Sequence, residues 1–149
     1  ESLSAPWFRR VINLYPPYLG SGARVKYVSE DFRHLVVVMP LHWYNRNAVG
    51  AHFGGSLFSM TDPFYMLMLM KILGNGYVVW DKNASIDYLL PGSGTMTAEF
   101  RLSEAQIRDI RSNTENGDKY LPEYNIAVTD NNGQEVAHVR KTLYIRKKS

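Results

Sequence analysis

The chain has 149 residues, which suits one domain and leaves little room for two. Its composition, 45% hydrophobic and 21% charged, is that of a globular protein and not of a disordered one. The lack of cysteine excludes a disulfide framework, cysteine metal sites and a cysteine nucleophile, and it fits a cytoplasmic protein. The net charge of +3 is modest, and no nucleic-acid partner is expected because the basic residues lack interleaved aromatic side chains.

The N-terminal part of the chain is predicted to contain a helix and two strands. Residues 4–15 should form the helix, with Ser4 as its cap, Pro6 in its first turn and Pro16-Pro17 at its end. Residues 22–31 alternate polar and apolar side chains, and residues 35–39 are β-branched and apolar. Both patterns are typical of strands.

The C-terminal half is predicted to hold four more strands and a short helix. The strands should lie at about residues 77–90, 94–102, 123–130 and 135–146, and the turn Asp130-Asn-Asn-Gly133 should join the last two. Between them, Ser103 and Gln106 have the spacing of a capping box, which predicts a helix over about 103–112.

The middle of the chain, residues 55–73, is predicted to form a long central helix that is apolar on every side. Its most apolar run, residues 64–73, contains Lys71 and is far shorter than the roughly 20 residues of a membrane span, so no span is expected. A helix without a polar face must be surrounded on most sides. A curled antiparallel sheet can wrap most of it and a second copy of the chain can cover the rest, which predicts an α+β domain that dimerises.

The loop before this helix resembles the signature of phenylacetyl-CoA-type thioesterases of the hotdog superfamily. The matching positions are Asn47, Gly50, His52, Gly54, Gly55 and Asp62, with Asp62 seven positions after Gly55, while Phe53 interrupts the pattern after His52. The resemblance covers nearly the whole chain. It implies one hotdog domain over residues 1–149, acyl-CoA thioesterase activity, and no cofactor apart from the coenzyme A thioester as substrate. It also implies a homodimer, or a dimer of dimers (homotetramer), in which the acid of one subunit meets the glycine loop of the other.

Two roles are open for each part of the predicted catalytic site. The N–H groups of Gly54 and Gly55 could polarise the thioester carbonyl at a helix start, or the glycines could only permit tight packing. Asp62 could act as general base or nucleophile. Alternatively, it could be the N-cap of a helix that begins at Pro63.

The remaining candidate residues also have a functional and a structural interpretation. Asn47 could orient the attacking water or stabilise the loop, and His52 could bind substrate or cap the helix. Five further residues could bind the acyl chain or the coenzyme A phosphates: Phe53, Met60, Lys82, Arg140 and Lys141. Alternatively, they could lie in the core or in solvent. No metal site is expected, because the four histidines lack the spacing of metal ligands.

Two other functions remain open. His52-Phe53 resembles the start of the His-Phe-Pro motif of hotdog dehydratases, which would make the protein an enoyl-CoA hydratase or dehydratase that uses His52 and Asp62. If Asp62 is only a helix cap, the chain would be a non-catalytic acyl-binding dimer.

Overall fold

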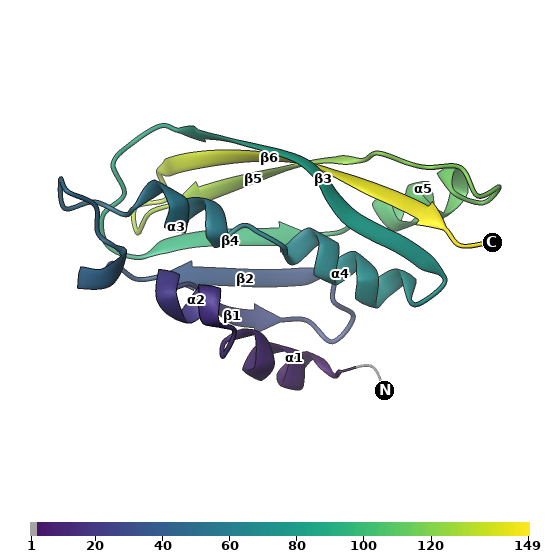
Figure 1. The fold of residues 1–149 in the computed structure, drawn as a ribbon, viewed down its shortest axis with the longest axis horizontal. Coiled ribbons are helices and arrows are strands. Elements are labelled where there is room, and N and C mark those ends of the chain that lie inside the picture. Colours follow the sequence, from purple (N-terminus) through teal and green to yellow (C-terminus); the bar gives the residue numbers. More distant parts are fainter. Residues whose placement is uncertain (1–2) are drawn as a thin grey trace.

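The computed structural model describes residues 3–149 as one antiparallel sheet with helices packed on it (Figure 1). The six strands lie in the order β1-β2-β4-β5-β6-β3. Their bounds are β1 Arg24–Val28, β2 His34–Met39, β3 Tyr77–Tyr88, β4 Met96–Arg101, β5 Glu123–Thr129 and β6 Glu135–Lys147. The helices are α1 Ala5–Ile12, α2 Pro16–Ser21, α3 Gly54–Ser59, α4 Phe64–Leu73 and α5 Glu104–Asn113, with a 3-10 turn, η1, at Trp43–Asn45.

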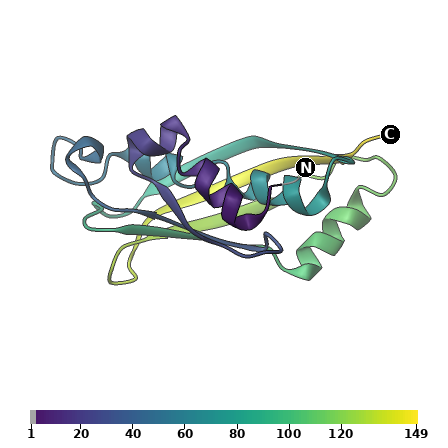
Figure 2. The same ribbon diagram turned by 90° about the horizontal axis from the view of Figure 1, so that it is seen from below.

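The core lies between the sheet and the central helical segment, as the apolar pattern of that segment requires. In Figures 1 and 2, α3 and α4 follow one another along one face of the curled sheet. Phe64 of α4 is fully buried and its ring lies 5.3 Å from that of Phe100 on β4. The α+β architecture, with a curled sheet around a central apolar helical segment, is therefore confirmed. The sheet covers only one side of α4, and Met70 on another side is 49% exposed.

The prediction of one continuous helix over 55–73 is wrong in its bounds. The helix is interrupted between Ser59 and Phe64, so α3 and α4 are separate elements. Pro63 lacks an N–H group and its ring collides with the preceding turn, which ends regular helix before it. The Thr61 hydroxyl donates to the Phe58 carbonyl at 2.8 Å and closes the first helix.

Several element ends also differ from the sequence-based bounds. The helix predicted over 4–15 is present as α1 but ends earlier, at Ile12, and Pro16-Pro17, expected to end it, instead form the first turn of a second helix, α2. Proline is tolerated in a first turn, where its missing N–H has no intrahelical acceptor. The capping box of α5 is confirmed: Gln106 N donates to Ser103 Oγ at 3.1 Å, and Ser103 N donates to Gln106 Oε1 at 2.8 Å.

The two edges of the sheet differ in length and exposure. β1 is a five-residue edge strand flanked by α1, whereas β3 is a twelve-residue edge strand with mostly exposed or half-exposed side chains. A long uncovered edge presents unpaired backbone groups that another strand can join. None of the helices in residues 3–149 has the length and apolarity needed to cross a bilayer.

Candidate active site

The loop that leads into α3 is held by its own side chains. Asn47 Oδ1 accepts hydrogen bonds from the backbone N–H groups of Val49 and Ala51, each at 3.0 Å. Asn47 Nδ2 donates to the His52 carbonyl at 3.4 Å. The oxygen and the nitrogen of the Asn47 side-chain amide therefore both form hydrogen bonds within the loop. This is the loop-stabilising role, one of the two that the sequence left open.

His52 joins this loop to the segment before β4. Its backbone N–H donates to the Gly92 carbonyl at 2.9 Å, and its Nε2 lies 2.7 Å from the Gly94 carbonyl. A carbonyl only accepts, so Nε2 carries the proton and Nδ1, which is buried without a partner, is a bare acceptor. Burial lowers the pKa of His52, against the opposing effect of the Gly94 hydrogen bond. The predicted capping role is wrong, because the N-cap of α3 is Phe53 and no side chain caps it.

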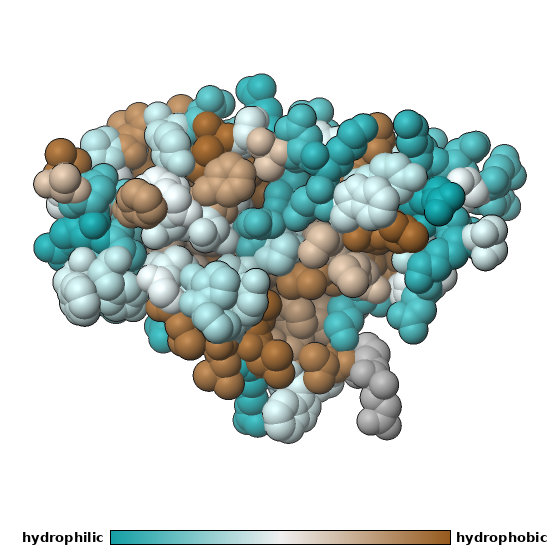
Figure 3. All heavy atoms as spheres, viewed as in Figure 1, coloured by the Kyte–Doolittle hydropathy of each residue, from teal (hydrophilic) through white to brown (hydrophobic). Residues whose placement is uncertain are grey.

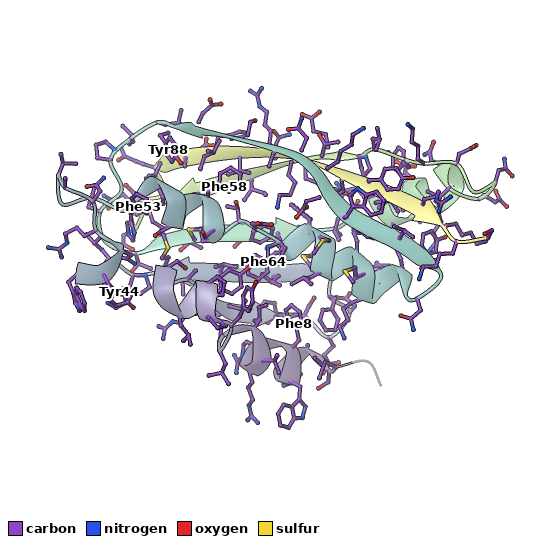
Figure 4. All side chains as sticks on the ribbon, viewed as in Figure 1. Phe8, Tyr44, Phe53, Phe58, Phe64 and Tyr88 are labelled. Atoms are coloured by element: carbon purple, nitrogen blue, oxygen red, sulfur yellow. The ribbon has the colours of Figure 1, made fainter. Side chains whose placement is uncertain are left out.

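A cleft of about 550 Å³ opens at the start of α3. Figure 4 places Phe53 and Tyr88 there. The lining is mostly apolar and comes from two segments, the entrance loop and the end of β3: Asn47, Val49, Ala51, His52, Phe53, Gly54, Gly55, Leu57, Tyr88, Leu89, Leu90, Pro91 and Gly92. The first N–H groups of a helix have no intrahelical acceptor, so Gly54 and Gly55 place donors at the wall of this cleft.

Both glycines are also required by packing. A Cβ at Gly54 would lie 3.0 Å from the Tyr88 hydroxyl, and that hydroxyl donates to the Gly54 carbonyl at 3.1 Å. A Cβ at Gly55 would lie 2.6 Å from Phe53 Cε1. The close approach of two aromatic rings thus accounts for the glycine pair, and any catalytic use of the N–H groups is additional to it.

At the other end of α3, Asp62 belongs to a cluster of ionisable side chains. Lys141 Nζ on β6 lies 3.2 Å from Asp62 Oδ1 and 3.4 Å from Asp81 Oδ2 on β3. The Lys141 side chain is 1% exposed, that of Asp81 26% and that of Asp62 52%. A buried ammonium is stable only when it is paired, and here two carboxylates pair with it. We call these three residues the Asp-Lys-Asp cluster.

Two further interactions define the charge state and position of the cluster. Burial raises the pKa of Asp81, the neighbouring Asp62 raises it further, and Lys141 opposes both. The hydroxyl of Tyr18 on α2 donates to the backbone carbonyl of Asp62 and so fixes the turn between α3 and α4. Burial, with the nearby Asp62 charge, raises the pKa of Tyr18, which keeps this hydroxyl a donor.

The structure overturns the N-cap interpretation of Asp62. The N-cap of α4 is Pro63, and no side chain caps that helix. The carboxylate of Asp62 instead contacts Lys141 and remains half exposed. Asp62 therefore presents an oriented carboxylate to solvent at the break in the central helical segment.

Four predicted substrate-binding residues lie outside the cleft. Lys141 is buried in its ion pairs, so its predicted contact with coenzyme A phosphates is wrong for the chain as it stands. Met60 is fully buried in the core and does not line the cleft. Lys82 and Arg140 are exposed on β3 and β6 and stay candidates for phosphate binding. Phe53 does line the cleft.

Asp62 does not line the cleft that contains Gly54 and Gly55. Gly55 lies at the start of α3, whereas Asp62 lies three positions beyond Ser59, the last residue of that helix. Within one copy of the chain, the two halves of the predicted site therefore lie at opposite ends of α3. The described residues also contain no group of three or more His, Asp or Glu side chains placed to hold a metal ion.

Two residues of these sites escaped the sequence analysis. Asp81 follows the apolar and aromatic run Tyr77–Trp80 in β3 and is followed by Lys82 and Asn83, so the sequence around it does not distinguish it from a surface acid. Tyr88 ends the same strand and covers Gly54, but its contact depends on the fold and no sequence pattern indicates it.

Solved structures share this architecture over most of their length. A protein of unknown function from Pseudomonas aeruginosa, described as a probable thioesterase, superposes with a TM-score of 0.81 at 21% identity, covering 93% of each chain. A thioesterase from Haemophilus influenzae superposes with a TM-score of 0.70 at 14% identity, covering 99% of this chain and 93% of its own. A Streptococcus mutans protein bound to acetyl-CoA superposes with a TM-score of 0.59 at 21% identity, covering 83% and 88%.

These similarities define the class of protein to which the chain belongs. The curled six-stranded sheet around a central helical segment is the hotdog fold, as the resemblance implied. No curated protein matches the sequence significantly. The chain belongs to the family described as a domain of unknown function, DUF4442, which it matches over residues 5–145.

Proposed function

We propose that this protein hydrolyses acyl-CoA thioesters as a dimer in which Asp62 of one copy acts beside Gly54 and Gly55 of the other. The observation that carries the proposal is the state of Asp62: it caps no helix, it is half exposed, and a buried lysine orients it. The names of the solved thioesterases and the acetyl-CoA in the Streptococcus mutans protein support the substrate class.

The reaction needs a polarised carbonyl and an attacking oxygen. The N–H groups of Gly54 and Gly55, at the positive end of α3, stabilise the negative charge that develops on the thioester oxygen. Asp62 takes a proton from water, the water oxygen attacks the carbonyl carbon, and the tetrahedral intermediate collapses with cleavage of the C–S bond. The departing thiolate then receives the proton. Direct attack by Asp62, with a mixed anhydride that water hydrolyses, uses the same geometry.

Lys141 acts in this scheme as a positioning residue. Its ammonium lies 3.2 Å from Asp62 Oδ1. This ion pair restricts the rotamers of the Asp62 side chain and so fixes the direction in which the carboxylate faces solvent. Asp81 pairs with the same ammonium at 3.4 Å and so helps to hold the lysine in place. Groups placed in this way lower the entropy that must be lost at the transition state.

The separation of the two half-sites supports a dimer. Asp62 lies beyond the end of α3 and the glycine pair lies at its start, so in the proposed dimer a second copy brings the acid to each cleft. The uncovered β3 edge offers twelve residues for antiparallel pairing with its counterpart in a second copy. The end of β3 also lines the cleft, at Tyr88, so pairing along this edge brings the partner close to it.

The two alternative functions have less support. A hydratase would need His52 as a proton carrier at the substrate, but this residue is only 3% exposed and its Nε2 is engaged by the Gly94 carbonyl. A non-catalytic acyl-binding dimer was favoured only if Asp62 were a helix cap, and it is not.

A thiol-release assay over a panel of acyl-CoAs tests the proposal. The wild-type protein should release coenzyme A from at least one acyl class, and Asp62→Ala should abolish that release. Asp109→Ala, which removes an exposed aspartate on α5, is the matched control and should keep full activity. Retention of activity by Asp62→Ala would sink the assigned mechanism, and enoyl-CoA hydration without thiol release would support the hydratase instead.

A further inference from the structure

Helix α1 and the residues that flank it carry an exposed apolar stripe. The stripe consists of Leu3, Trp7, Val11 and Leu14, spaced four, four and three residues apart. Their exposed fractions run from 42% for Leu3 to 71% for Leu14. The opposite face of α1 is the one that packs on the core, because Phe8 is buried with its ring 5.5 Å from that of Phe32. The N-terminal segment therefore buries one set of apolar side chains and leaves a second set exposed.

The charged side chains of residues 3–29 are all basic, and they lie beside this stripe. Between residues 3 and 29 the sequence contains no Asp or Glu, and its four basic side chains are all exposed: Arg9, Arg10, Arg24 and Lys26. A groove of about 800 Å³ between α1 and the β1 side of the sheet brings these four together with Trp7 and Leu14. The Arg10 guanidinium lies 5.6 Å from the centre of the Trp7 ring.

We propose that this surface docks on an anionic phospholipid bilayer, with the stripe among the acyl chains and the four basic residues at the phosphates. In Figure 3, apolar side chains gather at the lower edge of the molecule, where Figure 1 places α1 and α2. An amphipathic helix with Trp and Leu on one side and Arg beside them is typical of helices that lie in a membrane interface. Anionic lipids add attraction for each nearby Lys or Arg.

Charge selects this occupant over a second copy of the chain. Two copies that met through this surface would bring eight basic side chains together with no acid from residues 3–29 to compensate them, since each copy supplies four. A bilayer surface offers phosphates and hydrocarbon in two adjacent layers, in the same arrangement as the basic residues and the stripe. The proposal does not depend on the thioesterase activity.

The fold leaves this surface compatible with the dimer proposed above. β1, beside α1, forms one edge of the sheet and β3 forms the other. Pairing along β3 would therefore leave both copies of the α1 surface uncovered. Two such surfaces on one particle would strengthen binding to the same vesicle.

Vesicle sedimentation tests the proposal in the full chain. The protein should sediment with vesicles that contain phosphatidylglycerol and not with vesicles of phosphatidylcholine alone, and added salt should weaken the binding. Trp7→Ser with Leu14→Ser, and Arg9→Glu with Arg10→Glu, should each lower the partition coefficient by about tenfold or more. Trp43→Ser, which removes a tryptophan that is 84% exposed elsewhere, and Arg146→Glu on β6 are the matched controls.

Tryptophan fluorescence gives a second readout that does not depend on the stripe variants. The chain has three tryptophans, so Trp43→Phe with Trp80→Phe leaves Trp7 as the single reporter. Its emission should shift to shorter wavelength on anionic vesicles and be quenched by brominated lipid. No binding to anionic vesicles, or binding without quenching of Trp7, would overturn the proposal. Loss of self-association in the stripe variants without vesicle binding would assign the surface to a second copy and would also overturn it.

Discussion

The two ends of α3 are built from different kinds of interaction. At its start, backbone N–H groups, a buried histidine and two aromatic rings form an apolar cleft, and the residues that form the entrance loop are neighbours in the sequence. At its other end, the Asp-Lys-Asp cluster joins residues 62, 81 and 141 from three elements. In the mechanism that we propose, the first end binds and polarises the acyl group and the second supplies the base. The proposal therefore predicts that two copies of the chain share each site.

The largest expected effect is the loss of kcat when the carboxylate of Asp62 is removed. Asp62→Asn keeps the shape of the side chain but removes its capacity to accept a proton from water. We expect kcat to fall by about 10²–10⁴-fold, the range for loss of a general base or acid. Because Asp62 is half exposed, the midpoint of urea unfolding should change little. Steady-state thiol release measures kcat, and equilibrium unfolding of the same preparation measures stability. A large loss of stability would instead assign Asp62 a structural role.

The next effect concerns the lysine that positions Asp62. Lys141→Met leaves the half-buried Asp81 without its counter-charge, so we expect a loss of about 3 kcal/mol in the free energy of unfolding. The double variant Lys141→Met with Asp81→Asn should regain much of that stability, because neither charge is then unpaired.

Activity separates a positioning role for Lys141 from a purely structural one. The stable double variant should still show a lowered kcat with little change in KM, because Asp62 is then free to rotate. Lys141→Arg, which keeps the charge, should recover part of the lost kcat. Wild-type kcat in the double variant would contradict the positioning role.

A smaller effect is expected at the cleft. Gly54→Ala should cost about 1 kcal/mol, since its methyl group would crowd the Tyr88 ring at 3.0 Å. Gly20→Ala in α2, where nothing lies within 4 Å of the added carbon, is the control and should not destabilise the protein. Adding Tyr88→Ala should restore stability to the Gly54→Ala protein. If activity stays low in that stable double variant, the acyl carbonyl needs the close backbone approach that only glycine permits.

The smallest expected effect is a pH dependence of stability at the cleft end. Burial, with a contribution from His42, lowers the pKa of His52, so the unfolded chain binds a proton at higher pH than the folded one. The stabilisation from the neutral ring is complete above the unfolded pKa, about 6.5, and is lost as the pH falls below it. Urea midpoints should therefore decline from neutral to mildly acidic pH, and His52→Gln should flatten that decline. An equally steep decline in His52→Gln would assign it to other groups.

The sequence predicted the cleft end better than the acidic end. The pattern from Asn47 to Gly55 is local, so its residues meet regardless of how the rest of the chain folds. Lys141 is a candidate for phosphate binding by its charge alone, but it continues the inward alternation of Ala137, Val139, Leu143 and Ile145 on β6. Because every second residue of β6 from 137 to 145 faces the core, this alternation indicates that the Lys141 side chain is buried. Its partners could then be sought among acids in other apolar strands. The break at Pro63 was considered, but only packing against Tyr18 and Lys141 decides where the Asp62 side chain points.

Subunit complementation tests the central claim most directly. Asp62→Asn and Gly55→Val should each be inactive as homodimers, the first for lack of the base and the second because its side chain crowds Phe53 at the start of α3. Mixed dimers that carry one copy of each should regain thiol release, up to about half of wild type, because one of their two sites then has both an intact acid and an intact glycine pair. Mixed dimers as inactive as their parents, beside an active wild type, would contradict a site shared between two copies.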